Sequence, residues 1–206
     1  MNPSLFLELE AAVSAVEPRV WERYNPGLTD EEIDAIMASA SFALPDDLRA
    51  LYKWRNGSDN QGEGFLGTGL WMMPLETGDH ESESIRSDAR EFYKITSETP
   101  PLSLESHAFI YLFDDHGDGT YLSAAFPFNE HSTCDIYQFY HMDGLGRMFR
   151  GVEPMILTAI EAWRSGIFTS VEDANGWELS YEFQDWLSLG QRMNPDCDYW
   201  LDGAAQ

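Results

Sequence analysis

The sequence predicts an α+β fold in which a largely antiparallel β-sheet is flanked by helices. Stretches with apolar residues at helical spacing lie toward both ends, at 4–16 and 153–165. Between them, aromatic-rich stretches alternate around short turns, which indicates two successive hairpins and an antiparallel meander. The chain has 206 residues, of which 43% are hydrophobic and 14% aromatic, so it can bury the core of one domain.

Three helices are predicted in the first part of the chain. Residues 4–16 form the first. Thr29 and Glu32 have the spacing of a capping box, so a second helix begins after Thr29. Pro45 suits the first turn of a third helix, because the N–H that proline lacks would have no partner there. Gly57 is expected to end that helix in the left-handed conformation.

The middle of the chain predicts one short strand, one polar helix and the two hairpins. The strand covers 70–74 and the helix 79–94. Turn residues separate the expected strands of each hairpin. The expected strands are 107–113 with 120–126, and 134–142 with 147–150, the second pair flanking a turn at 143–146.

The last forty residues have a different composition. From Ser165 to Gln206 there are eight acidic residues and one basic residue. Apolar spacing predicts a further helix near 178–191, followed by a frayed terminus. We expect a domain over 1–165 and an acidic, helical extension over 166–206 that packs on it. Trp177, Trp186 and Trp200 either pin this extension to the domain or anchor a partner.

The acidic composition limits the class of partner. Thirty-six Asp and Glu face twelve Lys and Arg, giving a net charge of −24. Such a surface repels nucleic acid phosphates and anionic membranes and attracts basic proteins. Solubility alone is an equally simple explanation for the charge.

The sequence indicates a cytoplasmic protein. Its first twenty residues carry three glutamates and no basic n-region, and no apolar run is long enough to span a membrane. Cys134 and Cys197 are far apart and form no CxxC motif, so we expect them to be reduced, although a disulfide stays open.

No pattern for catalysis or metal binding is present. The stretch "FDDHGDGTYL" fails as an EF-hand from Asp114, because His116 and Ala125 stand where acidic ligands are required. It also fails from Asp115. Its glycines and aspartates suit a hairpin turn, with a weak cation site as the open alternative. There is no nucleophile elbow, HExxH or Walker motif, so we expect no enzyme, metal or cofactor.

Three stretches, taken in order, resemble the SUKH superfamily, the Smi/Knr-type cell-wall assembly regulators and bacterial immunity proteins. They are "NPGLTDEEIDAIMASASFALPDDLRALYKWRNG" at 25–57, "GFLGTGLWMMPLET" at 64–77 and "AFIYLFDDHGDGTYLSAAF" at 108–126. The resemblance covers about 20–165. It implies a SUKH-like sheet flanked by helices, and a protein-binding function without enzymatic activity.

The resemblance also implies two kinds of partner. Bacterial members neutralise a cognate toxin, such as a nuclease or deaminase, whereas fungal members are regulatory hubs that bind endogenous proteins. For this acidic chain we expect an immunity protein that occludes a basic toxin, with the regulatory adaptor as the alternative. Neither nucleic acid nor membrane is expected as a partner. The expected partner-binding residues are acids with no nearby base in sequence: Asp114, Asp115, Asp118, Glu178, Glu182 and Asp185.

Overall fold

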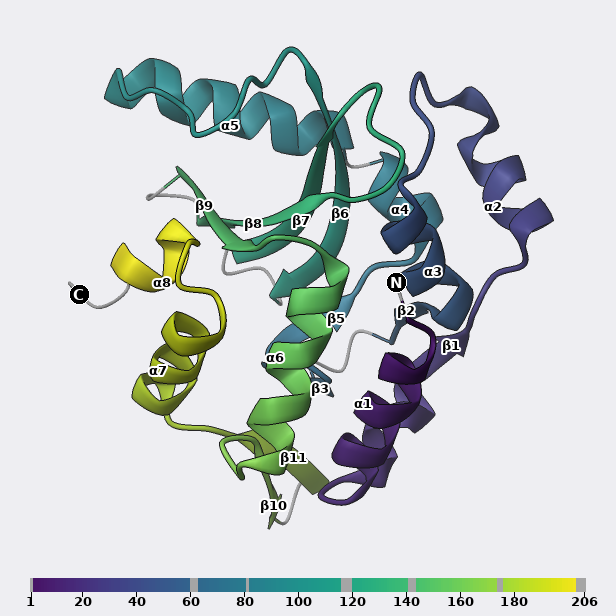
Figure 1. Cartoon of the computed structure of the whole chain (residues 1–206), viewed down its shortest axis with the longest axis vertical. Helices are drawn as coiled ribbons and strands as arrows, with labels where there is room; N and C mark the ends of the chain where they lie inside the picture. Colours follow the sequence, from purple (N-terminus) through teal and green to yellow (C-terminus); the bar gives the residue numbers. More distant parts are fainter. Residues whose placement is uncertain are drawn as a thin grey trace.

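The computed structural model describes residues 2–59, 63–80, 82–115, 120–140, 144–173 and 176–202. Its centre is a five-stranded antiparallel sheet with the order β5-β6-β7-β8-β9, shown in Figure 1. The strands are β5 (Leu70–Met72), β6 (His107–Asp115), β7 (Thr120–Pro127), β8 (Asp135–Tyr140) and β9 (Gly144–Phe149). This confirms the predicted α+β fold and its antiparallel meander.

Three two-stranded sheets accompany the central sheet. Each is antiparallel, and the pair β3–β4 contacts both β5 and β11. Their strands are β1 (Tyr24–Pro26) with β2 (Arg55–Ser58), β3 (Glu63–Gly64) with β4 (Gly67–Thr68), and β10 (Thr169–Asp173) with β11 (Gly176–Ser180).

Helices cover both faces of the central sheet. In Figure 1, α5 crosses one face, and α6 lies on the other beside α1, α7 and α8. The α-helices are α1 (Ser4–Ser14), α2 (Asp30–Ile36), α3 (Asp46–Trp54), α4 (Leu75–His80), α5 (Ser82–Thr96), α6 (Val152–Arg164), α7 (Phe183–Met193) and α8 (Asp198–Asp202). Two 3-10 helices, η1 (Pro18–Arg23) and η2 (Met37–Ser39), complete the described elements.

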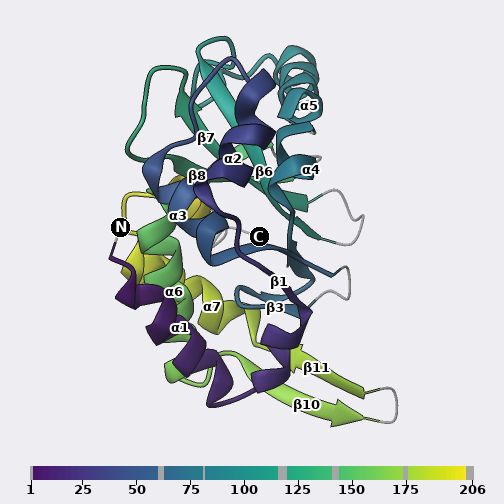
Figure 2. The ribbon, with the colours of Figure 1, turned by 90° about the vertical axis from the view of Figure 1, so that its right-hand side faces the viewer.

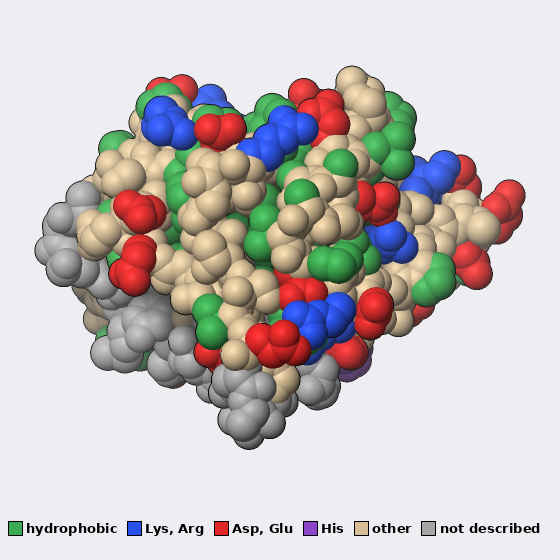
Figure 3. Space-filling model, turned by 90° about the horizontal axis from the view of Figure 1, so that it is seen from below, with side chains coloured by type: hydrophobic (Ala, Val, Ile, Leu, Met, Phe, Trp, Pro, Cys, Tyr) green, Lys and Arg blue, Asp and Glu red, His purple; other side chains and the backbone are tan. Residues whose placement is uncertain are grey.

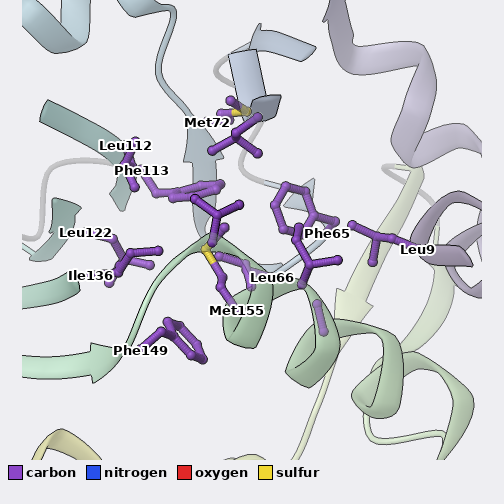
Figure 4. Close-up of a cluster of buried hydrophobic side chains, with 14 of the residues drawn as sticks. Leu9, Phe65, Leu66, Met72, Leu112, Phe113, Leu122, Ile136, Phe149 and Met155 are labelled. Carbon is purple, nitrogen blue, oxygen red and sulfur yellow. The ribbon is translucent and has the colours of Figure 1, made fainter. Parts of the chain in front are cut away.

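The alternation of side chains along β7 divides the core into two clusters. Leu122, Ala124 and Phe126 belong to the large cluster on the α6 side, part of which Figure 4 shows. Tyr121 and Ala125 belong to the smaller cluster on the α5 side. Successive side chains of a strand point to opposite faces, so β7 is buried on both.

The predicted capping box is confirmed, whereas the predicted end of the third helix at Gly57 is wrong. The helix α2 begins after Thr29, whose hydroxyl accepts from the backbone N–H of Glu32, while the Glu32 carboxylate accepts from the Thr29 N–H. Gly57 has the expected left-handed φ of 81°, but α3 already ends at Trp54, and Gly57 lies within β2.

Three boundaries differ from the predictions. The polar helix is two helices, α4 and α5, and α4 begins before the predicted start at 79. The strand β9 already begins at Gly144, inside the predicted turn. Residues 178–180, which fall within the helix predicted near 178–191, belong to β11 instead, and α7 begins only at Phe183.

As far as Asp202, the predicted frayed terminus is also wrong, because the chain forms α8 and buries Trp200. Residues 203–206 lie outside the described part of the chain. The Trp200 side chain is 1% exposed, and its indole N–H donates to the carbonyl of Met148 at 2.6 Å. Trp186 is buried too, and its ring lies 5.3 Å from that of Trp200. These two tryptophans therefore pin the C-terminal helices to the same core as β9. The proposed division of the chain at residue 165 stays a prediction.

A buried aspartate joins three distant parts of the chain. The Asp47 side chain lies at the start of α3 and is 5% exposed. Its carboxylate accepts from the backbone N–H groups of Leu48 at 2.8 Å, Cys134 at 3.2 Å and Val152 at 3.5 Å. Burial raises the pKa of Asp47. The residue thus ties α3 to the loop before β8 and to the N-terminus of α6.

Candidate protein-binding surfaces

Asp114 lies near the end of β6, beside a row of aromatic side chains. The hydroxyl of Tyr111 donates to its Oδ1 at 2.7 Å. The Tyr111 ring meets the edge of Tyr121 at 5.1 Å, and Tyr121 stacks on Phe139 at 4.9 Å. This row crosses β6, β7 and β8. The aromatic-rich stretches and the turn residues between them predicted the strands, but only the pairing register places these rings beside the carboxylate.

Asp114 faces Trp71 across the β5–β6 pair. Both side chains are half-buried, so this end of the sheet presents an aromatic ring and a carboxylate together. Asp115 is the last residue of β6 and pairs with Leu70. Asp118 lies outside the described residues, so the predicted acidic trio is placed in part.

The other predicted acids lie on the C-terminal segment. Glu178 is exposed on β11, opposite Val171 of β10. Glu182 is the N-cap residue of α7, although its side chain makes no capping hydrogen bond. Asp185 is exposed in the first turn of α7, where the helix dipole favours a negative charge.

The two acidic groups belong to different sheets. Asp114 lies on the central sheet, whereas Glu178 lies on the hairpin β10–β11, which Figure 2 shows at the lower end of the molecule. The small pair β3–β4 contacts β5 on one side and β11 on the other. The structure therefore links the two groups through β3–β4 but does not bring them into one cluster.

Ion pairs within the chain occupy most of its basic residues. Ten of the twelve Lys and Arg residues lie within 4.0 Å of a carboxylate of the described residues. On the face shown in Figure 3, the blue basic groups lie against red acidic ones. Over the part of the chain that the structure describes, Asp114, Glu178, Glu182 and Asp185 form none of these ion pairs. The negative charge that no ion pair offsets therefore lies on the acids outside these pairs, and these four are among them.

A network around Glu17 fastens the hairpin β10–β11 to η1. The Glu17 carboxylate is buried and accepts two hydrogen bonds from the Arg19 guanidinium at 2.6 Å and one from the Ser170 hydroxyl at 2.6 Å. Trp177 of β11 stacks with the guanidinium groups of Arg19 and Arg23, at 5.3 and 4.4 Å. Hydrogen bonds from Arg19 lower the pKa of Glu17 to about 2. Trp177 is thus part of an internal anchor.

The described residues show no arrangement for metal binding. Among them no group of three His, Cys, Asp or Glu could hold a metal ion. Cys134 and Cys197 are free and buried, and burial raises the pKa of both thiols, which disfavours the reactive thiolate. None of the helices described is long and apolar enough to cross a membrane.

Comparison with known proteins identifies the family. A search of curated proteins found no match. The model of the SMI1 / KNR4 family (SUKH-1) matches residues 27–202, a range that includes the central sheet, α6 and the C-terminal helices. This confirms the resemblance drawn from the three sequence stretches. Because the match covers most of the chain, this protein belongs to the SMI1 / KNR4 family (SUKH-1).

Proposed function

We propose that the protein is a non-enzymatic immunity protein that neutralises a cognate bacterial toxin by binding and covering it. Family membership supports a domain of immunity or regulator type. The main support for the proposal is that ten basic residues form ion pairs within the chain, so the negative charge of other exposed acids is not offset by a basic partner. Such a surface favours a basic partner.

The proposed mechanism is occlusion in the cytoplasm. Acids at the end of β6 and on β11–α7 would face a basic toxin surface, such as the substrate-binding surface of a nuclease or a deaminase. Complementary charge raises the rate of association and makes it depend on salt, because exposed charges are screened over about 10 Å at an ionic strength of 0.1 M. The covered toxin would lose access to its substrate.

Co-expression with the toxin-like product of the neighbouring gene tests the proposal. We expect a stable complex on size-exclusion chromatography and loss of toxin activity at a stoichiometric ratio. A neighbouring toxin that stays free and active beside folded protein would contradict the proposal.

The alternative is a regulatory adaptor that binds an endogenous protein. Genomic context and affinity purification separate the two functions. A gene remote from any toxin, together with reproducible capture of a housekeeping protein at native expression level, would favour the adaptor.

A further inference from the structure

A small pocket opens on the α5 side of the sheet, between the loop after α5 and the loop that joins β7 to β8. Its volume is about 220 Å³. Ligand pockets for drug-sized molecules span roughly 300–1,000 Å³, so this pocket suits one side chain better than a whole small molecule. None of the predicted partner-binding residues that the structure describes lines it.

Two carboxylates, Glu130 and Asp135, line the pocket. Glu130 accepts from the N–H of His131 and from the N–H and hydroxyl of Ser132, all through Oε1. These bonds lower the pKa of Glu130 to about 2, so it is an anion throughout the physiological range. Asp135 also lines the pocket and is paired with Arg147 at 3.3 Å. Glu130 is therefore the lining carboxylate that has no ion pair among the described residues.

His107 also lines the pocket. Its Nδ1 lies 2.9 Å from the carbonyl oxygen of Ser103, an arrangement that requires a proton on Nδ1. In the neutral ring, Nε2 is then an acceptor. The apolar lining comes from residues such as Leu102, Ala125 and Pro127. An apolar wall with several acceptors suits a side chain that has an aliphatic stem and a cationic head with many donors.

We infer that this pocket binds an arginine side chain presented by another protein. The planar guanidinium has five donors in a fixed arrangement, which matches several acceptors at once, whereas the lysine ammonium is a compact point charge. Glu130 would pair with the guanidinium, and the apolar wall would contact the methylene stem.

The pocket is separate from the acids of the proposed function. Figures 1 and 2 show its two bordering loops at the upper end of the molecule and the hairpin β10–β11 at the lower end. A partner held at β11 and α7 would leave the pocket accessible. The inference therefore goes beyond the proposed function and describes a second, independent interaction site.

A titration with a single-residue probe tests the pocket without any partner. The probe is N-acetyl-arginine amide, and its control is N-acetyl-citrulline amide, which has nearly the same shape without the charge. We expect saturable shifts in the NMR amide signals of Ala125, Thr133 and Tyr137 with the arginine probe, and none with citrulline. The lysine analogue should bind more weakly. Equal shifts with citrulline, or none with arginine, would overturn the inference.

Two variants assign the binding to this pocket. Thr133 is exposed at the rim, so Thr133→Trp should obstruct the pocket and abolish the shifts, whereas Ser14→Trp on the exposed end of α1 should not. Glu130→Gln keeps an acceptor but removes the charge, and should weaken binding about tenfold. Glu22→Gln, at an exposed site on η1, is the matched control.

The melting temperature of each variant shows that it is folded. Shifts that persist in folded Thr133→Trp would place the probe elsewhere and refute the pocket. Toxin capture by a protein that ignores the probe would refute the pocket and keep the proposed function. Binding of the probe by a protein that captures no toxin would support the pocket and contradict the proposed function.

Discussion

At the scale of single residues, the structure separates two neighbours that look equivalent in sequence. Asp46 and Asp47 both stand in the first turn of α3, where the helix dipole favours acids. Asp46 is exposed. Asp47 is buried and accepts three backbone hydrogen bonds, from α3, from the loop before β8 and from α6. Its contribution to stability therefore comes from long-range contacts, which the sequence pattern could not reveal.

We expect Asp47→Asn to lower the free energy of unfolding by about 1–3 kcal/mol. The N–H groups of Leu48 and Cys134 donate to different oxygens of Asp47, and Asn has only one oxygen, so its NH₂ group would face one of these N–H groups. Asp46→Asn is the control and should cost about 0.3–1 kcal/mol. Urea denaturation of both variants measures the difference. Equal losses would show that Asp47 acts only on the helix dipole.

Glu17 should make the protein sensitive to acid. Its pKa is about 2 in the folded protein and 4.5 in the unfolded chain. As the pH falls between these values, the unfolded chain binds a proton that the folded protein does not, so stability decreases. Asp47 has the opposite effect on stability. Burial raises its pKa, so the stability that Asp47 contributes decreases as the pH rises through that pKa.

The measurement is the denaturation midpoint of the wild type and of Glu17→Gln from pH 5 to pH 2. We expect the variant to be less stable at pH 5 and to lose less stability on acidification. Glu22→Gln, on the same 3-10 helix, should behave like the wild type. Parallel curves for Glu17→Gln and the wild type would mean that the Arg19 pair does not protect the folded state.

At the scale of elements, the C-terminal segment depends on close packing between α7 and α8. Gly190 of α7 lies under the indole of Trp200, and a Cβ atom at that position would stand 2.1 Å from the ring. The Trp200 ring in turn meets Phe149 of β9 at 5.7 Å. The Trp200 side chain thus fills the space between α7 and β9, the edge strand of the central sheet. Asp198 of α8 also contacts this edge, because its carboxylate accepts from the backbone N–H of Arg147 at 2.8 Å.

Gly190→Ala should therefore displace Trp200 and lower the free energy of unfolding by about 1–3 kcal/mol or more, the usual cost of an overpacked core. Ser188→Ala changes an exposed residue of the same helix and should be close to neutral. Urea denaturation followed by tryptophan fluorescence measures both effects. A Gly190→Ala variant as stable as the wild type would show that α8 can move at little cost.

At the scale of the whole molecule, the distribution of charge matters more than its total. Internal ion pairs use most basic residues, so the acids outside those pairs set the field that a partner meets. Individual surface ion pairs contribute little to stability, about 0–1 kcal/mol each. Their main consequence here is electrostatic, because they cancel positive charge that would otherwise offset the acids.

Neutralising the predicted binding acids should slow association with a basic partner and reduce its dependence on salt. One variant changes Asp114, Asp115 and Asp118 to Asn. It should fold nearly normally, because Asn has the same size as Asp and keeps an oxygen that can accept from the Tyr111 hydroxyl. A second changes Glu178 and Glu182 to Gln and Asp185 to Asn. Stopped-flow association at several salt concentrations is the measurement.

A third variant controls for total charge. It changes Glu31, Glu98 and Glu153 to Gln, which removes the same charge from exposed sites elsewhere. We expect a smaller effect on the association rate than from either binding-site variant. If all three variants slow association equally, only the net charge matters and the binding face lies elsewhere.

The sequence by itself determined the local elements of this protein and its family. The sequence displays the capping at Thr29, the apolar spacing of α6 and the aromatic-rich stretches of β6 and β7 directly, because these features depend on near neighbours in the chain. Only the tertiary structure decided the state of residues 178–180, because Leu179 also fits the helical spacing of Phe183, Trp186 and Leu187. Gly176, at a φ of 129°, and the anchor around Glu17 select the hairpin.

The same distinction holds for the candidate binding sites. An excess of acids is visible in the sequence, but which acids remain outside ion pairs depends on contacts between residues as distant as Arg164 and Glu8. The pocket beside Glu130 depends on β6, β7 and β8 meeting two loops. Such long-range contacts follow from the packing of the whole chain, so no local pattern could have placed them.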